Sequence, residues 1–91
     1  MGIIDINEPH IEQMEALRAE LLVLRAKARV SQETIASIIG VSRQTYGSVE
    51  TGKKEMTRTL FLALVAYFQN NDDTRQMIVG ILGRKDSEKR I

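Results

Sequence analysis

Residues 31–53 read SQETIASIIGVSRQTYGSVETGK, and they contain two helix starts close together. Ser31 and Ser42 are both residues that cap helices through their side-chain oxygen. Each of the two segments that follow is closed by a glycine, the residue that most often ends a helix. The stretch therefore predicts two short helices, at about 32–39 and 43–50, joined by a tight turn.

The side chains of these two segments divide into an inner and an outer set. Ala36 is small where the two helices approach each other most closely, and Gly40 lets the chain turn with a positive φ. Val41 and Val49 are expected to fill the wedge between the helices, where Tyr46 joins them. Two short helices with this turn form a helix-turn-helix arrangement, whose second helix lies in the major groove of DNA.

The outer face of the second helix carries Arg43, Gln44, Gly47 and Ser48. Arginine binds O6 and N7 of guanine and glutamine binds N6 and N7 of adenine, so Arg43 and Gln44 are suited to contact base edges. A glycine inside a helix costs about 1 kcal/mol relative to alanine. Close approach to DNA or to a neighbouring helix would explain Gly47, as would simple tolerance.

Apolar spacing predicts three further helices around this pair. The first runs from about residue 8 to about residue 29 and has apolar residues at spacings of three and four: Ile11, Met14, Leu17, Leu21, Leu24 and Ala28. Another follows the cap Thr57 and covers 58–68. The last contains Met77, Ile78, Ile81 and Leu82 and runs to Gly83.

The size and composition of the chain fit a single small globular domain. It has 91 residues, of which 43% are hydrophobic and 27% charged. We expect an N-terminal arm at 1–7, a helix-turn-helix domain at 8–83 and a charged flexible tail at 84–91. The chain has no cysteine, and its longest apolar run is far shorter than the roughly 20 residues of a membrane helix. A cytoplasmic protein without a cofactor, a metal or a membrane partner is expected.

Positive charge is concentrated in the middle of the chain, although the formal net charge is only +1. Residues 1–22 hold five acidic side chains and one arginine, whereas residues 23–58 hold seven basic and three acidic side chains. Such an uneven distribution is compatible with binding to a polyanion, but helices often carry solvated charges of one sign.

The central stretch resembles the phage repressor and Cro-type helix-turn-helix family, also called the XRE type. The residues that carry the resemblance are 31–36, 40–46 and 50–53, which fall in register without a gap within a region of about 22–68. The resemblance implies an all-α, five-helix repressor-like DNA-binding domain, here with an extended first helix.

The resemblance also implies which residues contact DNA. Base contacts are implied for Arg43, Gln44 and Ser48. Contacts to backbone phosphates are implied for Gln32, Ser42, Lys53, Lys54 and Arg58. Gln32 would in addition brace the base-contacting residue behind it.

Other positions have structural roles in this family or depart from its pattern. Arg25 and Glu50 match a pair that the family uses to hold its first helix against its third. Met56 stands where the family often has proline, and Arg58 where it usually has an apolar residue. The path of the loop before the fourth helix is therefore left open.

These features favour a sequence-specific, double-stranded DNA-binding transcriptional regulator that acts as a homodimer, because a dimer reaches two half-sites. The fifth helix and the N-terminal extension are the expected interface. The alternative is a protein-interaction module, antitoxin-like or bridging, that keeps the fold and holds a protein partner through the same segments. An enzyme is not expected, because His10 is the single histidine and no phosphate-binding glycine loop is present.

Overall fold

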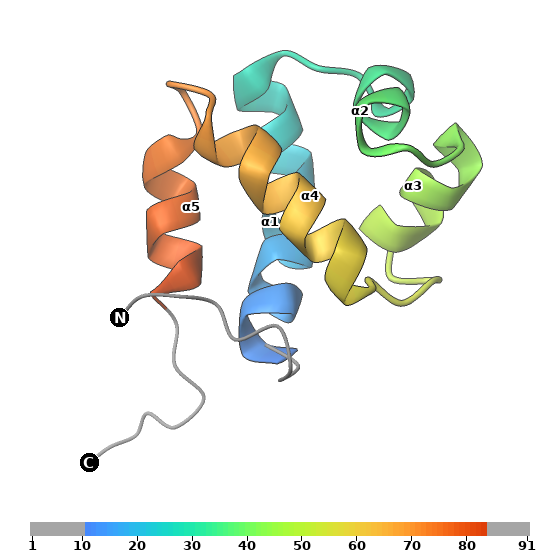
Figure 1. Ribbon diagram of the computed structural model, residues 1–91, viewed down its shortest axis with the longest axis horizontal. Helices are drawn as coiled ribbons and strands as arrows, with labels where there is room; N and C mark the ends of the chain where they lie inside the picture. Colours follow the sequence, from blue (N-terminus) through green and yellow to red (C-terminus); the bar gives the residue numbers. More distant parts are fainter. Residues whose placement is uncertain (1–10, 84–91) are drawn as a thin grey trace.

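The computed structural model describes residues 11–83, and every regular element in that range is a helix. The helices are α1 (Ile11–Ala28), α2 (Gln32–Ile39), α3 (Arg43–Glu50), α4 (Arg58–Gln69) and α5 (Arg75–Leu82), as labelled in Figure 1. The prediction of an all-α, five-helix fold is confirmed for these residues. The predicted N-terminal arm, the predicted tail and the first turn expected before Ile11 lie outside the described residues.

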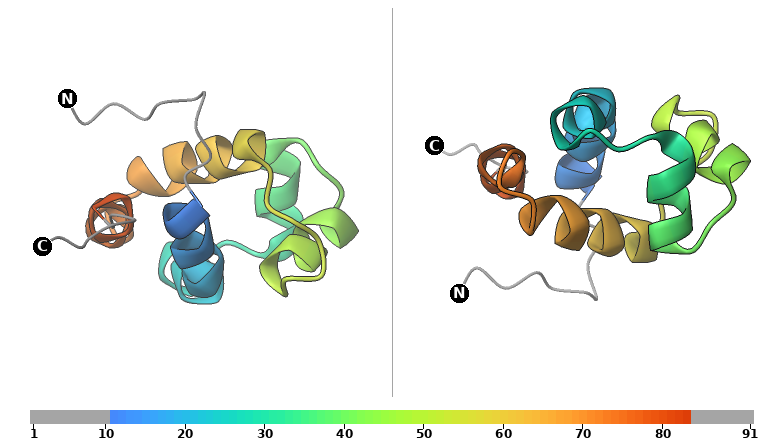
Figure 2. Two further views of the ribbon diagram at one scale, coloured as in Figure 1. Left: turned by 90° about the horizontal axis from the view of Figure 1, so that it is seen from below. Right: turned by 90° about the horizontal axis from the view of Figure 1, so that it is seen from above.

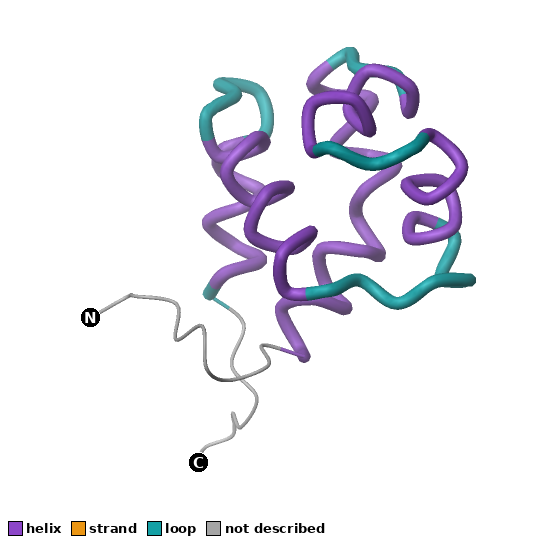
Figure 3. The backbone as a smooth tube through the Cα atoms, turned by 45° about the vertical axis from the view of Figure 1, so that its right-hand side comes forward, coloured by secondary structure: helices purple, strands orange, loops and turns teal. Residues whose placement is uncertain are grey.

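The long helix α1 holds the other elements together. It contacts α3 on one side and α4 and α5 on the other, while α2 packs against α3 and α4. Both views in Figure 2 show α1 and α3 on the same side of α4. Figure 3 shows the connections as short teal segments, of which residues 51–57 form the longest within the described chain. This loop follows α3 directly, so its path influences any surface that α3 presents.

The helix starts are where the local signals place them. The hydroxyl oxygens of Ser31, Ser42 and Thr57 each accept a hydrogen bond from the backbone N–H three residues further on, at 3.0, 3.0 and 3.1 Å. Gly40 has a φ of +85°, and so does Gly52 just beyond the end of α3. These are left-handed conformations that glycine adopts without the steric penalty of a Cβ. The turn between α2 and α3 therefore depends on Gly40.

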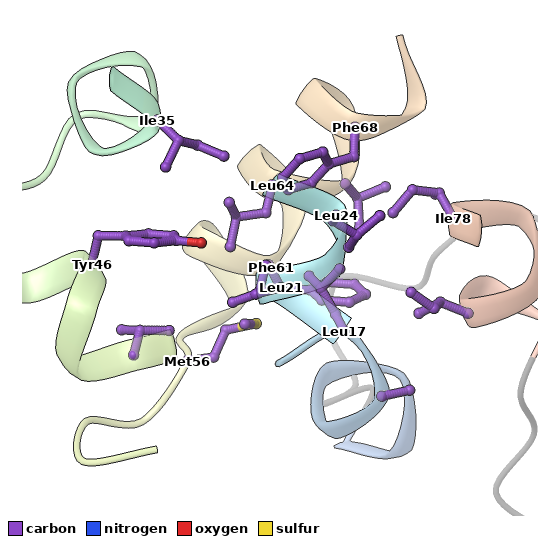
Figure 4. Close-up of a cluster of buried hydrophobic side chains, with 14 of the residues drawn as sticks. Leu17, Leu21, Leu24, Ile35, Tyr46, Met56, Phe61, Leu64, Phe68 and Ile78 are labelled. Atoms are coloured by element: carbon purple, nitrogen blue, oxygen red, sulfur yellow. The ribbon is translucent and has the colours of Figure 1, made fainter. Parts of the chain in front are cut away.

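The core lies where α1, α4 and the inner faces of the shorter helices meet. Figure 4 shows Tyr46 of α3, Ile35 of α2 and Ile78 of α5 pointing toward the side chains of α1 and α4. The largest fully buried side chains are those of Tyr46, Phe61, Phe68, Leu17, Leu21, Leu24, Ile35, Leu64, Ile78, Val49 and Thr74. The predicted inward positions of α2 and α3 are confirmed, because Ala36, Tyr46 and Val49 are each 1% exposed.

One residue of the predicted apolar stripe on α1 is not in the core. Ile11 is 56% exposed, whereas Leu17, Leu21 and Leu24 are fully buried. Successive spacings of three residues each fall about 60° short of a full helical turn. Two such steps, through Met14, separate Ile11 from Leu17, so Ile11 has rotated about 120° away from the buried side.

The start of α5 depends on a contact that the sequence did not indicate. Thr74 is fully buried, and its hydroxyl donates a hydrogen bond of 2.6 Å to the carbonyl oxygen of Phe68 near the end of α4. Asn71 shapes the same turn by accepting a hydrogen bond at 2.8 Å from the backbone N–H of Asp73. The buried hydroxyl therefore joins the two helices by adding a hydrogen bond to a carbonyl that also accepts the backbone N–H of Asn71 at 3.3 Å.

α1 ends on a residue other than glycine in a left-handed conformation. Arg29 has a φ of +59°, and its N–H donates to the carbonyl of Ala26 at 3.2 Å. The N–H of the buried Val30 donates to the carbonyl of Arg25 at 3.1 Å. These two bonds and the buried residue after the turn are the features of a Schellman ending, which normally has glycine at this position.

Arg29→Gly is expected to raise the free energy of unfolding by about 1 kcal/mol. A left-handed conformation costs a residue with a Cβ about 1–2 kcal/mol, and the greater flexibility of glycine in the unfolded chain offsets part of that gain. Urea titration followed by circular dichroism would measure the change. Arg29→Ala is the control, since it removes the same charge but keeps the Cβ. An equal gain in both variants would show that charge and not backbone strain is responsible.

Candidate nucleic-acid interface

The α3 helix presents polar side chains outward and buries its apolar ones. Tyr46 and Val49 are in the core, while Arg43 and Gln44 are exposed and Ser48 is partly exposed. The N-terminus of α3 is held by its Ser42 cap, and the whole helix rests on α1 and α2. The position of the outward side chains therefore follows from burial of the opposite face.

A polar hollow lies between the outer face of α3 and the loop that follows it. It is lined by Gln44, Thr45, Ser48, Lys53 and Lys54. The backbone N–H of Lys54 donates to the carbonyl of Ser48 at 3.0 Å, which ties the loop back onto the helix. The structure thus brings two predicted base-contacting residues beside two residues predicted to contact phosphates. Lysine ammonium groups beside hydroxyl and amide groups suit an anionic ligand such as a phosphate.

Arg58 lies further along the chain and does not line this hollow. It is the first residue of α4 and is exposed. Met56 points inward, and only 7% of its surface is exposed. The side chain of the next residue, Thr57, caps the N-terminus of α4. The loop path that the sequence left open is therefore fixed by burial of Met56.

Ser42 and Gln32 both make contacts inside the domain. The Ser42 hydroxyl donates to Thr45 Oγ1 at 3.0 Å while accepting the N–H of the same residue. The side-chain amide of Gln32 reaches across α3 and donates from Nε2 to Glu50 Oε1 at 3.3 Å. The phosphate contacts assigned to Ser42 and Gln32 stay predictions.

Gly47 lies directly beneath this amide. A Cβ added at Gly47 would lie 3.7 Å from Gln32 Oε1, an ordinary van der Waals distance. The Gln32 side chain of α2 is therefore a neighbour of Gly47, but it leaves room for a Cβ and does not require glycine at this position.

Arg25 and Glu50 form a bidentate ion pair between α1 and α3. Arg25 Nε donates to Glu50 Oε1 and Arg25 Nη2 to Glu50 Oε2, both at 3.1 Å. The two side chains are only 15% and 9% exposed. Arg25 Nη1 also donates to the carbonyl of Val30 at 3.3 Å. Together with the bond from Gln32, this pair connects α1 and α2 to the end of α3 and so constrains the angle at which α3 is presented.

The environment of this pair keeps both groups charged. Burial, the largest single influence, acts to raise the pKa of Glu50, but the hydrogen bonds from Arg25 and Gln32 help to bring it below its usual value. The hydrogen bond to Glu50 raises the pKa of Arg25. Burial, followed by the nearby Glu50 carboxylate, raises the pKa of Tyr46 far above its ordinary range, so its hydroxyl stays neutral.

Arg18 is absent from the residues that the sequence predicts for the site. In the structure its guanidinium lies against Gly52, in the loop that carries Lys53 and Lys54. A signal was present in the sequence, because Arg18 precedes Arg25 by seven residues, close to two helical turns. The two arginines therefore lie on the same side of α1, the side that faces α3.

Within residues 11–83, no three histidine, cysteine or carboxylate side chains are grouped so that they could hold a metal ion. None of the helices described there is both long enough and apolar enough to cross a membrane.

Comparison with known proteins identifies a broad likeness to one protein family. Residues 16–76 match the model of a protein family described as a helix-turn-helix domain. The matched range starts within α1, includes α2, α3 and α4, and ends at the beginning of α5. No curated protein and no solved structure matches the chain. The family match confirms the resemblance drawn from the central stretch of the sequence.

Proposed function

Because the chain belongs to the helix-turn-helix domain family, we propose that it is a sequence-specific, double-stranded DNA-binding transcriptional regulator of the XRE type. In this proposal α3 enters the major groove. The observation that carries it is the division of α3 into a buried face with Tyr46 and Val49 and an exposed face with Arg43 and Gln44. An exposed arginine and glutamine side by side at a helix N-terminus suit the contacts that distinguish guanine and adenine.

The phosphate contacts are proposed on both sides of α3. Ser42 and Gln32 lie at the N-termini of α3 and α2, where backbone N–H groups favour an anion. Lys53 and Lys54 lie in the loop after α3, and Arg58 opens α4. Such contacts orient the protein on the duplex without distinguishing one sequence from another.

We propose that the regulator acts as a homodimer. One recognition helix contacts only a few base pairs, so two copies on half-sites about one helical turn apart gain both affinity and specificity. The proposed interface is α5 together with the N-terminal extension. Val79 on α5 is 56% exposed, and this exposed apolar residue supports the choice.

Selection of duplexes from a random pool by the purified protein tests this proposal. The expected result is a recovered motif with two-fold symmetry, whose half-sites are separated by roughly 10 base pairs. Affinity for the selected duplex should fall steeply with added salt, because bound phosphates release counterions. Failure of the folded protein to enrich any motif would contradict the proposal. Copurification of a stoichiometric protein partner, with no shift of DNA, would favour the protein-interaction alternative.

A further inference from the structure

The guanidinium of Arg18 lies against the backbone of the loop that follows α3. A Cβ built at Gly52 would be 3.5 Å from Arg18 Nη1 and 3.8 Å from Arg18 Cζ. Gly52 has a φ of +85°, a backbone conformation that disfavours a residue with a Cβ. The flat arginine head and the glycine turn therefore form one surface, to which α1 and the loop both contribute.

This surface continues the polar hollow beside α3. A second hollow, between the first half of α1 and the loop, is lined by residues that include Arg18, Gly52 and Lys54. Lys54 lines the hollow beside α3 as well. The loop therefore separates two adjoining hollows, one on the side of Gln44 and one on the side of Arg18. In Figure 1 the lower half of α1 lies at the level of this loop.

Arg18 forms no ion pair with the described part of the chain. No carboxylate among residues 11–83 lies within 4.0 Å of its guanidinium, whereas Arg25, two turns later on the same side, is held by Glu50. Two acidic residues, Glu15 and Glu55, line the hollow on the Arg18 side. Their negative charges offset the positive charges of Arg18 and Lys54 in this hollow. An anion would therefore be bound by direct hydrogen bonds from the guanidinium N–H groups and not by net charge.

We propose that Arg18 binds a phosphate of the DNA backbone, which extends the contact surface from the helix-turn-helix onto α1. The proposal rests on the DNA-binding function proposed above. A guanidinium presents a fork of N–H donors that matches two phosphate oxygens. Together with Lys53 and Lys54 on the loop, Arg18 binds the DNA strand where the strand runs beyond the end of α3.

The test compares Arg18→Gln with Lys27→Gln. Both variants remove one positive charge from α1, but the two positions are nine residues apart, which is two and a half turns. The extra half turn places Lys27 on the opposite side of the helix, where it is exposed. The selected duplex and a scrambled duplex are titrated with each variant over a range of salt concentrations, and urea denaturation checks that each variant is folded.

Arg18→Gln is expected to reduce the slope of log K against log salt by about 0.9 per protomer. Affinity for both duplexes should fall roughly threefold to tenfold, and their ratio should stay unchanged, because phosphate contacts carry no sequence information. Lys27→Gln should leave slope and affinity near those of the wild type. Arg18→Lys, which keeps the charge, should keep the slope.

Three results would overturn the inference. A wild-type slope in Arg18→Gln would exclude a phosphate contact, and a parallel loss of affinity at every salt concentration would mean that Arg18 only supports the loop. Equal losses in Arg18→Gln and Lys27→Gln would show an effect of overall charge and would also refute the contact. Absence of DNA binding by the wild-type protein would instead refute the proposed function, and this inference with it.

Discussion

Replacing Arg43 and Gln44 together by alanine is expected to abolish discrimination between the selected duplex and unrelated DNA while the fold survives. A good bidentate contact to a base contributes about 1–3 kcal/mol of discrimination, and each protomer of a dimer would lose two of them. Affinity for the selected duplex should therefore fall to the level of non-specific binding, a loss of roughly a thousandfold. Fluorescence anisotropy with the selected and scrambled duplexes would measure both values.

A matched variant separates loss of specificity from loss of general binding. Lys53→Gln removes a predicted phosphate contact from the loop, so it should weaken binding to both duplexes alike and preserve their ratio. Because Arg43 and Gln44 are exposed, the double variant should unfold at nearly the wild-type urea concentration. Recovery of the same motif by the double variant from a random pool would refute the assigned base contacts.

Glu50→Ala is expected to destabilise the domain by roughly 2–4 kcal/mol. The change would leave the Arg25 guanidinium, only 15% exposed in the wild type, without its carboxylate. It would also deprive the Gln32 amide of the acceptor at 3.3 Å. Stranding a largely buried charge is more destabilising than removing both members of a pair. Urea denaturation would measure the change in unfolding free energy.

The double variant Arg25→Met with Glu50→Met tests this explanation. It removes both charges and supplies flexible apolar side chains, so it should be clearly more stable than Glu50→Ala alone. If the double variant were as unstable as Glu50→Ala, the loss would come from the missing connection between the helices and not from a stranded charge.

The Glu50 carboxylate is also expected to make the stability of the folded protein depend on pH. The pKa of Glu50 is lower in the folded protein than its ordinary value of 4.5. A carboxylate of this kind contributes stability that is fully present above the unfolded pKa and is lost as the pH falls through the folded pKa. Wild-type stability should therefore decline in acid below about pH 4.5, and Glu50→Gln should lack that part of the decline. Thermal unfolding at a series of acidic pH values would show whether the two proteins differ.

The helix boundaries could be predicted closely because the signals for them are local. Ser31, Ser42 and Thr57 cap the segments that they precede, through an oxygen and an N–H only three residues apart. The spacing of apolar residues likewise depends on one helix at a time, and it placed Tyr46 and Val49 correctly in the core. Ile11 is exposed although it follows the apolar spacing, because two successive spacings of three residues place it on a different side of α1 from Leu17.

The candidate site was predicted less completely. The exposed positions of Arg43 and Gln44 follow from the register of a single helix. The bond from Gln32 to Glu50 joins residues 18 positions apart, and the placement of Arg18 beside Gly52 brings together residues that are further apart still. No local rule specifies which side chain of one helix reaches which atom of another.

From its residues alone, this chain can be identified as an all-helical domain with two short helices around a glycine turn, because capping, turn formation and apolar periodicity act over a few neighbouring positions. Packing of distant segments decides the features that these local signals do not specify. Burial of Val30 holds Arg29 in a left-handed backbone conformation at the end of α1, and packing of α5 brings the Thr74 hydroxyl to the Phe68 carbonyl. It also sets the guanidinium of Arg18 against the loop after α3. These contacts arise only when elements remote in sequence share one core, since burial then selects conformations and partners that no single segment prefers.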